Sequence, residues 1–133
     1  MFIERLLNQD NTPLIEQTIR FAAAREKLIA ENVANVDTPG YLQKDMSVEK
    51  FQQMLRERVE SRNASPVGST SFDDIETEVE NPTANILFHD RNNRSMEQLM
   101  SAGAKNALYH NMMIELLRKQ IGQFEMALKE RIA

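Results

Sequence analysis

Two histidines are the residues of this 133-residue chain that could most readily serve as a base or a metal ligand. His110 falls on the apolar side of a predicted helix, and neither a second histidine nor a pair of carboxylates lies one turn away. His89 is followed directly by Asp90 in a polar connector, and adjacent residues do not converge on one ion. We therefore expect His110 to be a packed histidine. The alternative is that it serves as a metal ligand or as a base.

An acidic cluster is the second group with potential chemistry. Residues 73–80 contain five acids and no base, a composition that could attract Ca²⁺. The spacing lacks both the DxDxDG pattern and the terminal glutamate of an EF-hand loop. Because these acids alternate with Ile75, Thr77 and Val79, the pattern instead favours a strand with an acidic, solvated face. Such a face would also hinder edge-to-edge pairing with another sheet.

The composition excludes several kinds of chemistry. The chain has no Cys, and therefore no disulfide, thiolate nucleophile or cysteine-bound metal. A net charge of -4 and an isoelectric point of about 5.2 do not suit a nucleic-acid binder, and no basic stripe offsets them. None of GxGxxG, GxxxxGK[ST], HExxH or GxSxG occurs. We predict a protein that is not an enzyme, with no catalytic residue, metal site, cofactor or small-molecule substrate.

The chain also lacks the signals of a membrane-inserted or Sec-exported protein. No run of 18 or more apolar residues could span a bilayer. The N-terminal segment includes Glu4 and Asp10 and has no unbroken apolar core, so we expect no Sec-type signal peptide. Work outside the cytoplasm would therefore need another export route.

The first long element predicted is a helix from Pro13 to about Ala34. Thr12 can cap it, and a proline suits its first position. Its apolar residues recur at steps of three and four, which makes a broad stripe on a helix about 33 Å long. One seam comprises Ile15, Ile19, Ala22, Glu26, Ile29, Val33 and Val36, and a neighbouring seam comprises Leu14, Phe21 and Leu28.

A strong turn signal follows this helix. Asn35 is suited to end the helix in the left-handed conformation. Thr38-Pro39-Gly40-Tyr41 fits a type II turn, in which Pro39 fixes the first central φ and Gly40 supplies the positive φ of the second.

The middle of the chain carries weaker signals. Residues 48–61 predict a second helix, capped by Ser47, with one apolar face formed by Val48, Phe51, Leu55 and Val59. Residues 61–71 predict a flexible loop because they are small, polar and broken by proline and glycine. The acidic strand at 72–80 and the apolar run Ala84 to Phe88 are expected to pair as a small hairpin.

The longest element predicted is a helix over residues 96–132, preceded by a capping box formed by Ser95 and Gln98. Its length of about 55 Å exceeds the roughly 28 Å diameter of a compact domain of this size. Its seam therefore overhangs the shorter first helix and needs another chain to cover it. That seam comprises Met100, Gly103, Ala107, His110, Ile114, Leu117, Ile121, Phe124 and Leu128.

We therefore predict a mainly all-α fold, with long N- and C-terminal helices paired as a coiled-coil-like hairpin. Residues 1–45 and 95–133 are expected to form one helical core, and 46–94 an irregular middle segment with a short helix and a β-hairpin. Five of the eight methionines lie in 96–126, which suits either adaptable contacts between subunits or ordinary core filling. The expected assembly seam comprises Ile15, Ile19, Ala22, Ile29, Val33, Met100, Ala107, Ile114, Leu117, Ile121, Phe124 and Leu128.

One ten-residue motif is specific enough to point to a family. Asn32-Val33-Ala34-Asn35-Val36-Asp37-Thr38-Pro39-Gly40-Tyr41 resembles the signature of the bacterial flagellar rod, hook and axial proteins. The short length, Asn92-Asn93 and the stretch Asn106 to Asn111 resemble a basal-body rod protein of the B-type proximal kind. The chain departs from the usual pattern at Arg91 and Arg94 and in the residues of the stretch Asn106 to Asn111. The signature residues carried over are Asn32, Asn35, Asp37, Thr38, Pro39, Gly40 and Tyr41.

The resemblance implies a structural subunit of the proximal rod, whose terminal helices pack with neighbours into a hollow tube that is part of the drive shaft and export channel. It implies type III export without a cleaved signal and a place in the periplasmic part of the basal body. The implied partners are further copies, other rod proteins, the hook–basal-body adaptor protein, a membrane-ring protein and the export gate, but no nucleic acid. The alternative is a soluble helical adaptor or secretion chaperone, fully folded in solution.

Overall fold

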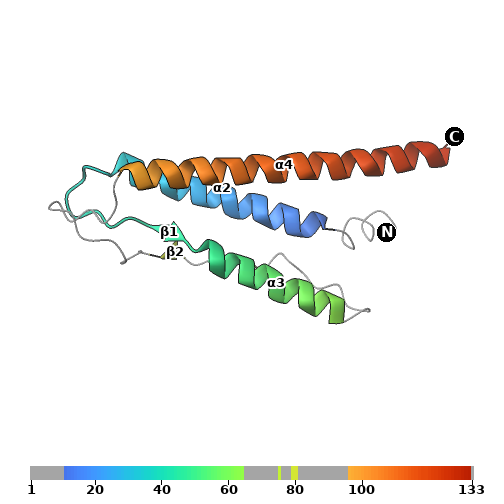
Figure 1. Cartoon of the computed structure of the whole chain (residues 1–133), viewed down its shortest axis with the longest axis horizontal. Coiled ribbons are helices and arrows are strands. Elements are labelled where there is room, and N and C mark those ends of the chain that lie inside the picture. Colours follow the sequence, from blue (N-terminus) through green and yellow to red (C-terminus); the bar gives the residue numbers. More distant parts are fainter. Residues whose placement is uncertain (1–10, 65–74, 76–78, 81–95, 133) are drawn as a thin grey trace.

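Two long antiparallel helices dominate the computed structural model, which describes residues 11–64, 75, 79–80 and 96–132. The described part contains α2 (Thr12–Ala34), α3 (Val48–Ala64) and α4 (Met96–Ile132), with two short strands, β1 (Asp45–Met46) and β2 (Val79–Glu80). α4 runs beside α2 and extends past its beginning, while α3 lies on the other side of α2 (Figure 1). The predicted fold class, mainly α-helical with paired terminal helices, is confirmed.

The start of α2 differs from the prediction by one residue. Asn11, rather than Thr12, occupies the N-cap position, and its carbonyl accepts the N–H of Ile15 at 3.0 Å. Pro13 falls in the first turn, where a missing N–H costs no helical hydrogen bond. The proline therefore marks the helix start correctly, although the cap lies one position earlier than threonine suggested.

One face of α2 packs against α3. The rings of Phe21 and Phe51 stack with centroids 4.1 Å apart and planes inclined by 6°. Around this pair lie the buried side chains of Met46 and Leu55. The cluster is completed by partly buried Leu14, Leu28, Val48, Val59 and Ile75. This cluster, which we call the phenylalanine cluster, is therefore the apolar contact that docks α3 on α2.

A second face of α2 packs against α4 through Ala22 and Ile29, both buried. An ideal Cβ placed on Gly103 would lie 3.5 Å from Ile29 Cγ2, so the helices approach closely at this point. Glu26 does not belong to this seam, contrary to the prediction, because its side chain is exposed. Arg25 is half-buried instead, and its ion pair with Asp45, described below, supplies the reason.

The middle helix is confirmed with its cap and its apolar face. Ser47 Oγ accepts the N–H of Lys50 at 3.2 Å, and the Ser47 carbonyl accepts the N–H of Phe51 at 3.2 Å. The helix continues to Ala64, three residues beyond the predicted end at 61. The loop prediction was wrong for these residues because the helix-disfavouring Pro66 comes only later.

The strand prediction is confirmed at Val79–Glu80, where the structure places β2. β2 pairs antiparallel with β1, with Asp45 opposite Glu80 and Met46 opposite Val79. The predicted partner, Ala84 to Phe88, lies outside the described residues. A two-residue strand such as β1 has no detectable alternation, so periodicity could not predict this pairing.

The boundaries of α4 agree with the prediction, and the Ser95 cap lies outside the described residues. The side that faces α2 is shifted at the start of the helix, where Leu99 is fully buried and Met100 is 62% exposed. From their residue counts, α4 is about 55 Å long and α2 about 34 Å. The predicted overhang of α4 is therefore present, as Figure 1 shows.

The phenylalanine cluster generates a stability prediction. We expect Phe51→Ala to lower the free energy of unfolding by about 3 kcal/mol, because a buried, stacked ring is replaced by a cavity. Urea denaturation followed by circular dichroism measures the change. The matched control is Gln52→Ala, an exposed neighbour on α3, which should leave stability within about 0.5 kcal/mol of wild type. Equal stability of the two variants would contradict a docking role for the cluster.

Candidate functional site

The turn after α2 has the type II geometry that the sequence predicts. Gly40 has a φ of 75°, in the left-handed region that side chains disfavour. The Tyr41 N–H donates to the Thr38 carbonyl at 3.3 Å and closes the turn. A Cβ on Gly40 would meet nothing within 4 Å. Glycine is therefore favoured here by the backbone conformation and not by a lack of space.

Asn35 ends α2 in a way that differs from the prediction. Its φ of -106° and ψ of 15° are not left-handed. Its backbone N–H and its Nδ2 both donate to the Glu31 carbonyl, at 3.1 Å and 2.8 Å. The side chain thus adds a second hydrogen bond to a carbonyl of the last helical turn. The Thr38 N–H then donates to the Asn35 carbonyl at 3.0 Å, which joins the cap to the turn.

Asn32 is the polar centre of this region, and its side chain is fully buried. Its Nδ2 donates to the Lys44 carbonyl at 2.6 Å, and its Oδ1 accepts the Lys44 N–H at 3.0 Å. The Tyr41 hydroxyl donates to the same Oδ1 at 3.3 Å. The carboxamide therefore pairs with both backbone groups of Lys44, as a neighbouring strand would. We call this set of contacts the Asn32 clamp.

An ion pair holds the returning chain at a second level of α2. Arg25 Nε lies 2.9 Å from Asp45 Oδ1, and its Nη2 lies 3.1 Å from Oδ2. Both side chains are largely buried, which makes this bidentate pair stronger than a surface ion pair. Asp45 Oδ1 also accepts the Met46 N–H at 2.8 Å. The pair therefore fixes β1 beside α2 and brings Met46 to the phenylalanine cluster.

Asn106 links the two long helices. Its side chain is buried, and its Nδ2 donates to the Ala22 carbonyl at 2.8 Å. A hydrogen bond from a buried amide to one particular carbonyl of the facing helix disfavours any sliding of α4 along α2, because sliding would leave the amide unpaired. Asn106 therefore sets the register of the pair, and with it the length of the α4 overhang.

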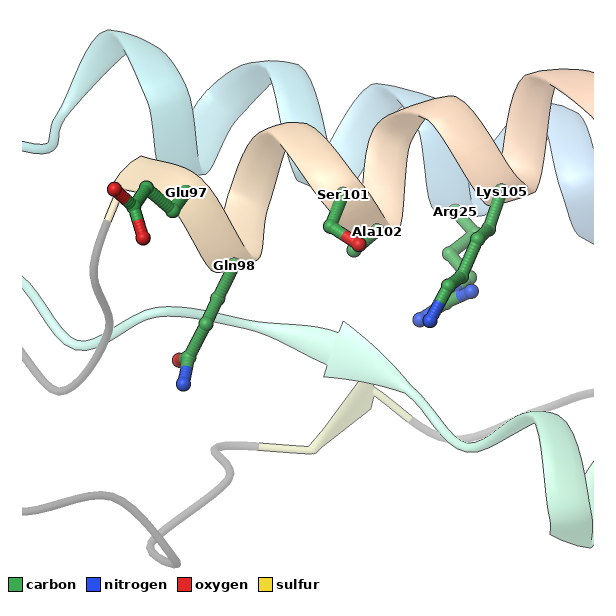
Figure 2. Close-up of a pocket in the computed structure, with 6 residues that line it drawn as sticks. All are labelled: Arg25, Glu97, Gln98, Ser101, Ala102 and Lys105. Atoms are coloured by element: carbon green, nitrogen blue, oxygen red, sulfur yellow. The ribbon is translucent and has the colours of Figure 1, made fainter.

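A shallow hollow of about 410 Å³ lies beside the first part of α4 and is lined also by Arg25 of α2. Figure 2 shows Arg25 of α2 and Lys105 of α4 pointing the same way below α4, with Gln98 nearer the start of α4. The Arg25 guanidinium is already paired with Asp45. Glu97 and Lys105 lie one turn before and one turn after Ser101 on the same face of α4. The hollow offers a polar surface for a contact. Its lining residues are Arg25, Glu97, Gln98, Ser101, Ala102 and Lys105.

The predicted assembly seam divides into three groups in the structure. Ala22 and Ile29 are buried inside the chain, between α2 and α4. Met100, Ile121 and Leu128 are exposed on α4. The half-buried members are Ile15, Ile19, Val33, Ala107, Ile114, Leu117 and Phe124. Exposed apolar surface on the seam is therefore concentrated on α4, and part of it lies where α4 extends past α2.

Sequence reasoning did not single out Asn106 as a contact between helices, nor the exposed row Leu108, Met112 and Leu116. Asn106 lies beside Ala107 of the predicted seam, and apolar periodicity gives no signal for it. The spacing of four between Leu108, Met112 and Leu116 is visible in the sequence, beside the longer predicted seam.

Other sequence-based expectations concern metals and membranes. His110 is half-buried in α4, and within residues 11–64, 75, 79–80 and 96–132 no group of three or more His, Asp or Glu side chains could hold a metal ion. His89 and most of the acidic cluster lie outside the described residues. Among the helices described, none has both the length and the apolarity needed to cross a bilayer.

Comparison with known proteins identifies relatives of similar sequence. No protein-family model matches the chain. The flagellar basal body rod protein FlgB of Salmonella typhimurium (strain LT2) is 26% identical over 115 residues, which cover 80% of this chain and 83% of the relative. The proteins of the same name from Escherichia coli (strain K12) and Shigella flexneri are each 24% identical over equal lengths. The chain resembles the FlgB rod proteins. The resemblance first seen in residues 32–41 is thereby confirmed over most of the chain.

The Asn32 clamp predicts a large effect from a small change. We expect Asn32→Asp to lower the free energy of unfolding by about 2 kcal/mol, because a carboxylate cannot donate to the Lys44 carbonyl. Tyr41→Phe, which removes only the longer bond to Oδ1, should cost less than about 1 kcal/mol. Chemical denaturation of both variants provides the measurement. An aspartate variant as stable as wild type would show that the clamp does not hold the turn.

The left-handed glycine predicts opposite signs for two glycine substitutions. Gly40→Ala should destabilise the chain by about 1 kcal/mol because alanine disfavours a φ of 75°. Gly122→Ala should stabilise it by up to about 1 kcal/mol, because this glycine lies in α4 with open space around its Cβ position. Thermal unfolding of the two variants checks both signs. A neutral or stabilising Gly40→Ala would be inconsistent with a constrained turn.

Proposed function

We propose that this chain is a structural subunit of the flagellar basal-body rod, of the proximal type, that polymerises through its terminal helices. The likeness to the FlgB proteins supports a structural role in the basal-body rod. The packing of the two long helices supports assembly as the mode of action, because an extended helical pair offers faces to several neighbours. In this proposal the polymer is a hollow tube, part of the drive shaft and of the export channel.

The observation that carries the proposal is the apolar seam of α4 where it extends past α2. Ile121 and Leu128 are each close to half exposed, and Phe124 lies between them on the same side of the helix. Water contact with this surface is unfavourable by about 25 cal/mol per Å² of apolar area. A helix of another copy would remove this surface from water. The chain then reaches its most stable state inside an assembly.

The finer parts of the proposal follow from the family resemblance. The subunit leaves the cytoplasm through the flagellar type III export gate without a cleaved signal and assembles in the periplasmic space. Its partners are further copies, other rod proteins, the hook–basal-body adaptor protein and the membrane-ring protein. The Asn32 clamp and the type II turn then set the direction in which the chain leaves α2.

Deletion of the gene, followed by complementation in the source bacterium, tests this function. Wild-type chain should restore swimming and be found in isolated basal bodies. Ile121→Asp and Leu128→Asp should reduce its amount there by about tenfold or more, because a buried unpaired carboxylate opposes packing. Melting temperatures of the purified variants should stay near wild type, since both positions are exposed in the single chain.

The matched control is Gln123→Asp, an exposed polar position between the two seam residues. This variant should swim and assemble normally. Normal assembly of both seam variants would refute the role of the overhang. Absence of the wild-type chain from basal bodies would overturn the proposed function itself.

A further inference from the structure

α4 carries a second apolar face, distinct from the seam that packs on α2. Leu108, Met112 and Leu116 follow one another at intervals of four residues and therefore share one side of the helix. They are 72%, 51% and 43% exposed, whereas Leu99 and Asn106, on the side of α4 that packs on α2, are buried. We call Leu108, Met112 and Leu116 the outer stripe. The outer stripe starts two residues after Asn106, beside the contact with Ala22, and is therefore not part of the overhang.

α2 also has an exposed face, which looks away from both α4 and α3. Ala23 and Ala30 lie there, seven residues apart, with Lys27 between them and Arg20 one turn earlier. Alanines leave a shallow surface that larger side chains of another helix can approach closely. The alkyl stems of Arg20 and Lys27 extend the apolar area, and the Arg20 guanidinium pairs with Glu16 at 2.7 Å. This outer face of α2 is therefore shaped to accept bulky residues such as those of the outer stripe.

The charges at the ends of the two faces match. Lys105 and Lys119 bracket the outer stripe about 21 Å apart, and Glu16 and Glu31 bracket the face of α2 about 22 Å apart. Both lysines are exposed and have no ion pair among the described residues. In an antiparallel arrangement Lys105 meets Glu31, and Met112 lies opposite Ala23. Lys119 meets Glu16, which also pairs with Arg20 of its own helix at 2.7 Å. Antiparallel pairing of two outer stripes about Met112 would instead bring Lys105 against Lys119.

We propose that the outer stripe of one copy docks on the outer face of α2 of a second copy. The contact uses different surfaces on the two molecules, so each bound copy presents a free surface of each kind and the assembly continues as an open polymer. Each α4 is then enclosed between its own α2 and that of a neighbour. This inference rests on the proposed function and specifies which faces of the subunits meet.

Single-cysteine variants test the contact, since the natural chain has no Cys. Purified Met112→Cys and Ala23→Cys chains are mixed at high concentration under a glutathione redox buffer, and disulfide-linked dimers are quantified. We expect the mixed dimer at about tenfold or more above the yield from Met112→Cys with Gln52→Cys, an exposed control position on α3. Yields equal to the control, or a dominant dimer of Met112→Cys with itself, would overturn the proposal.

Charge reversal provides a rescue test of the same contact. Glu16→Lys with Glu31→Lys in the Ala23→Cys chain should lower the mixed-dimer yield about fivefold, since two attractive pairs become repulsive. Lys105→Glu with Lys119→Glu in the Met112→Cys chain should restore it. Failure of the rescue would overturn the proposed alignment. Incorporation of the wild-type chain into basal bodies is measured separately, so a wrong contact is distinguishable from a wrong function.

Discussion

The antiparallel packing of α2 on α4 is the contact on which the rest of the structure depends. Ala22 and Gly103 are small enough for the two helices to approach closely, and Ile29 fills the space beside Gly103. The Asn106 amide then selects one register through the Ala22 carbonyl. Once this register is set, the position of the turn relative to the start of α4 and the length of the overhang are both determined.

The polar contacts after α2 hold successive residues of the returning chain against this helix pair. The Asn32 clamp holds the chain at Lys44, and the Arg25–Asp45 pair holds it at the next residue. Two fixed points so close together orient β1, and β1 delivers Met46 to the phenylalanine cluster. α3 docks through that cluster. Position is thus specified by hydrogen bonds and an ion pair, and apolar burial follows from it.

Local rules predicted much of this fold from the sequence. The long seams of α2 and α4 gave their boundaries to within one residue because no proline interrupts them, and Gly40 gave the turn because few residues accept a positive φ. The phase of α4 at its start could not be predicted, since Leu99 and Met100 are equally apolar. The clamp and the Arg25–Asp45 pair join residues 12 and 20 positions apart, and such contacts leave no trace in periodicity.

The polar contacts described here are distributed unevenly along the subunit. The Asn32 clamp, the Arg25–Asp45 pair and Asn106 all lie toward the turn end of the helix pair, while the overhang of α4 has no lateral support from the other described helices. Among the described helices, the pair therefore has a base at the turn end, held by these polar contacts, and a projecting arm, which is the part of α4 beyond α2. In the proposed rod, the base would keep the orientation of each subunit. The arm could bend to follow neighbours at slightly different angles without changing the orientation of the base.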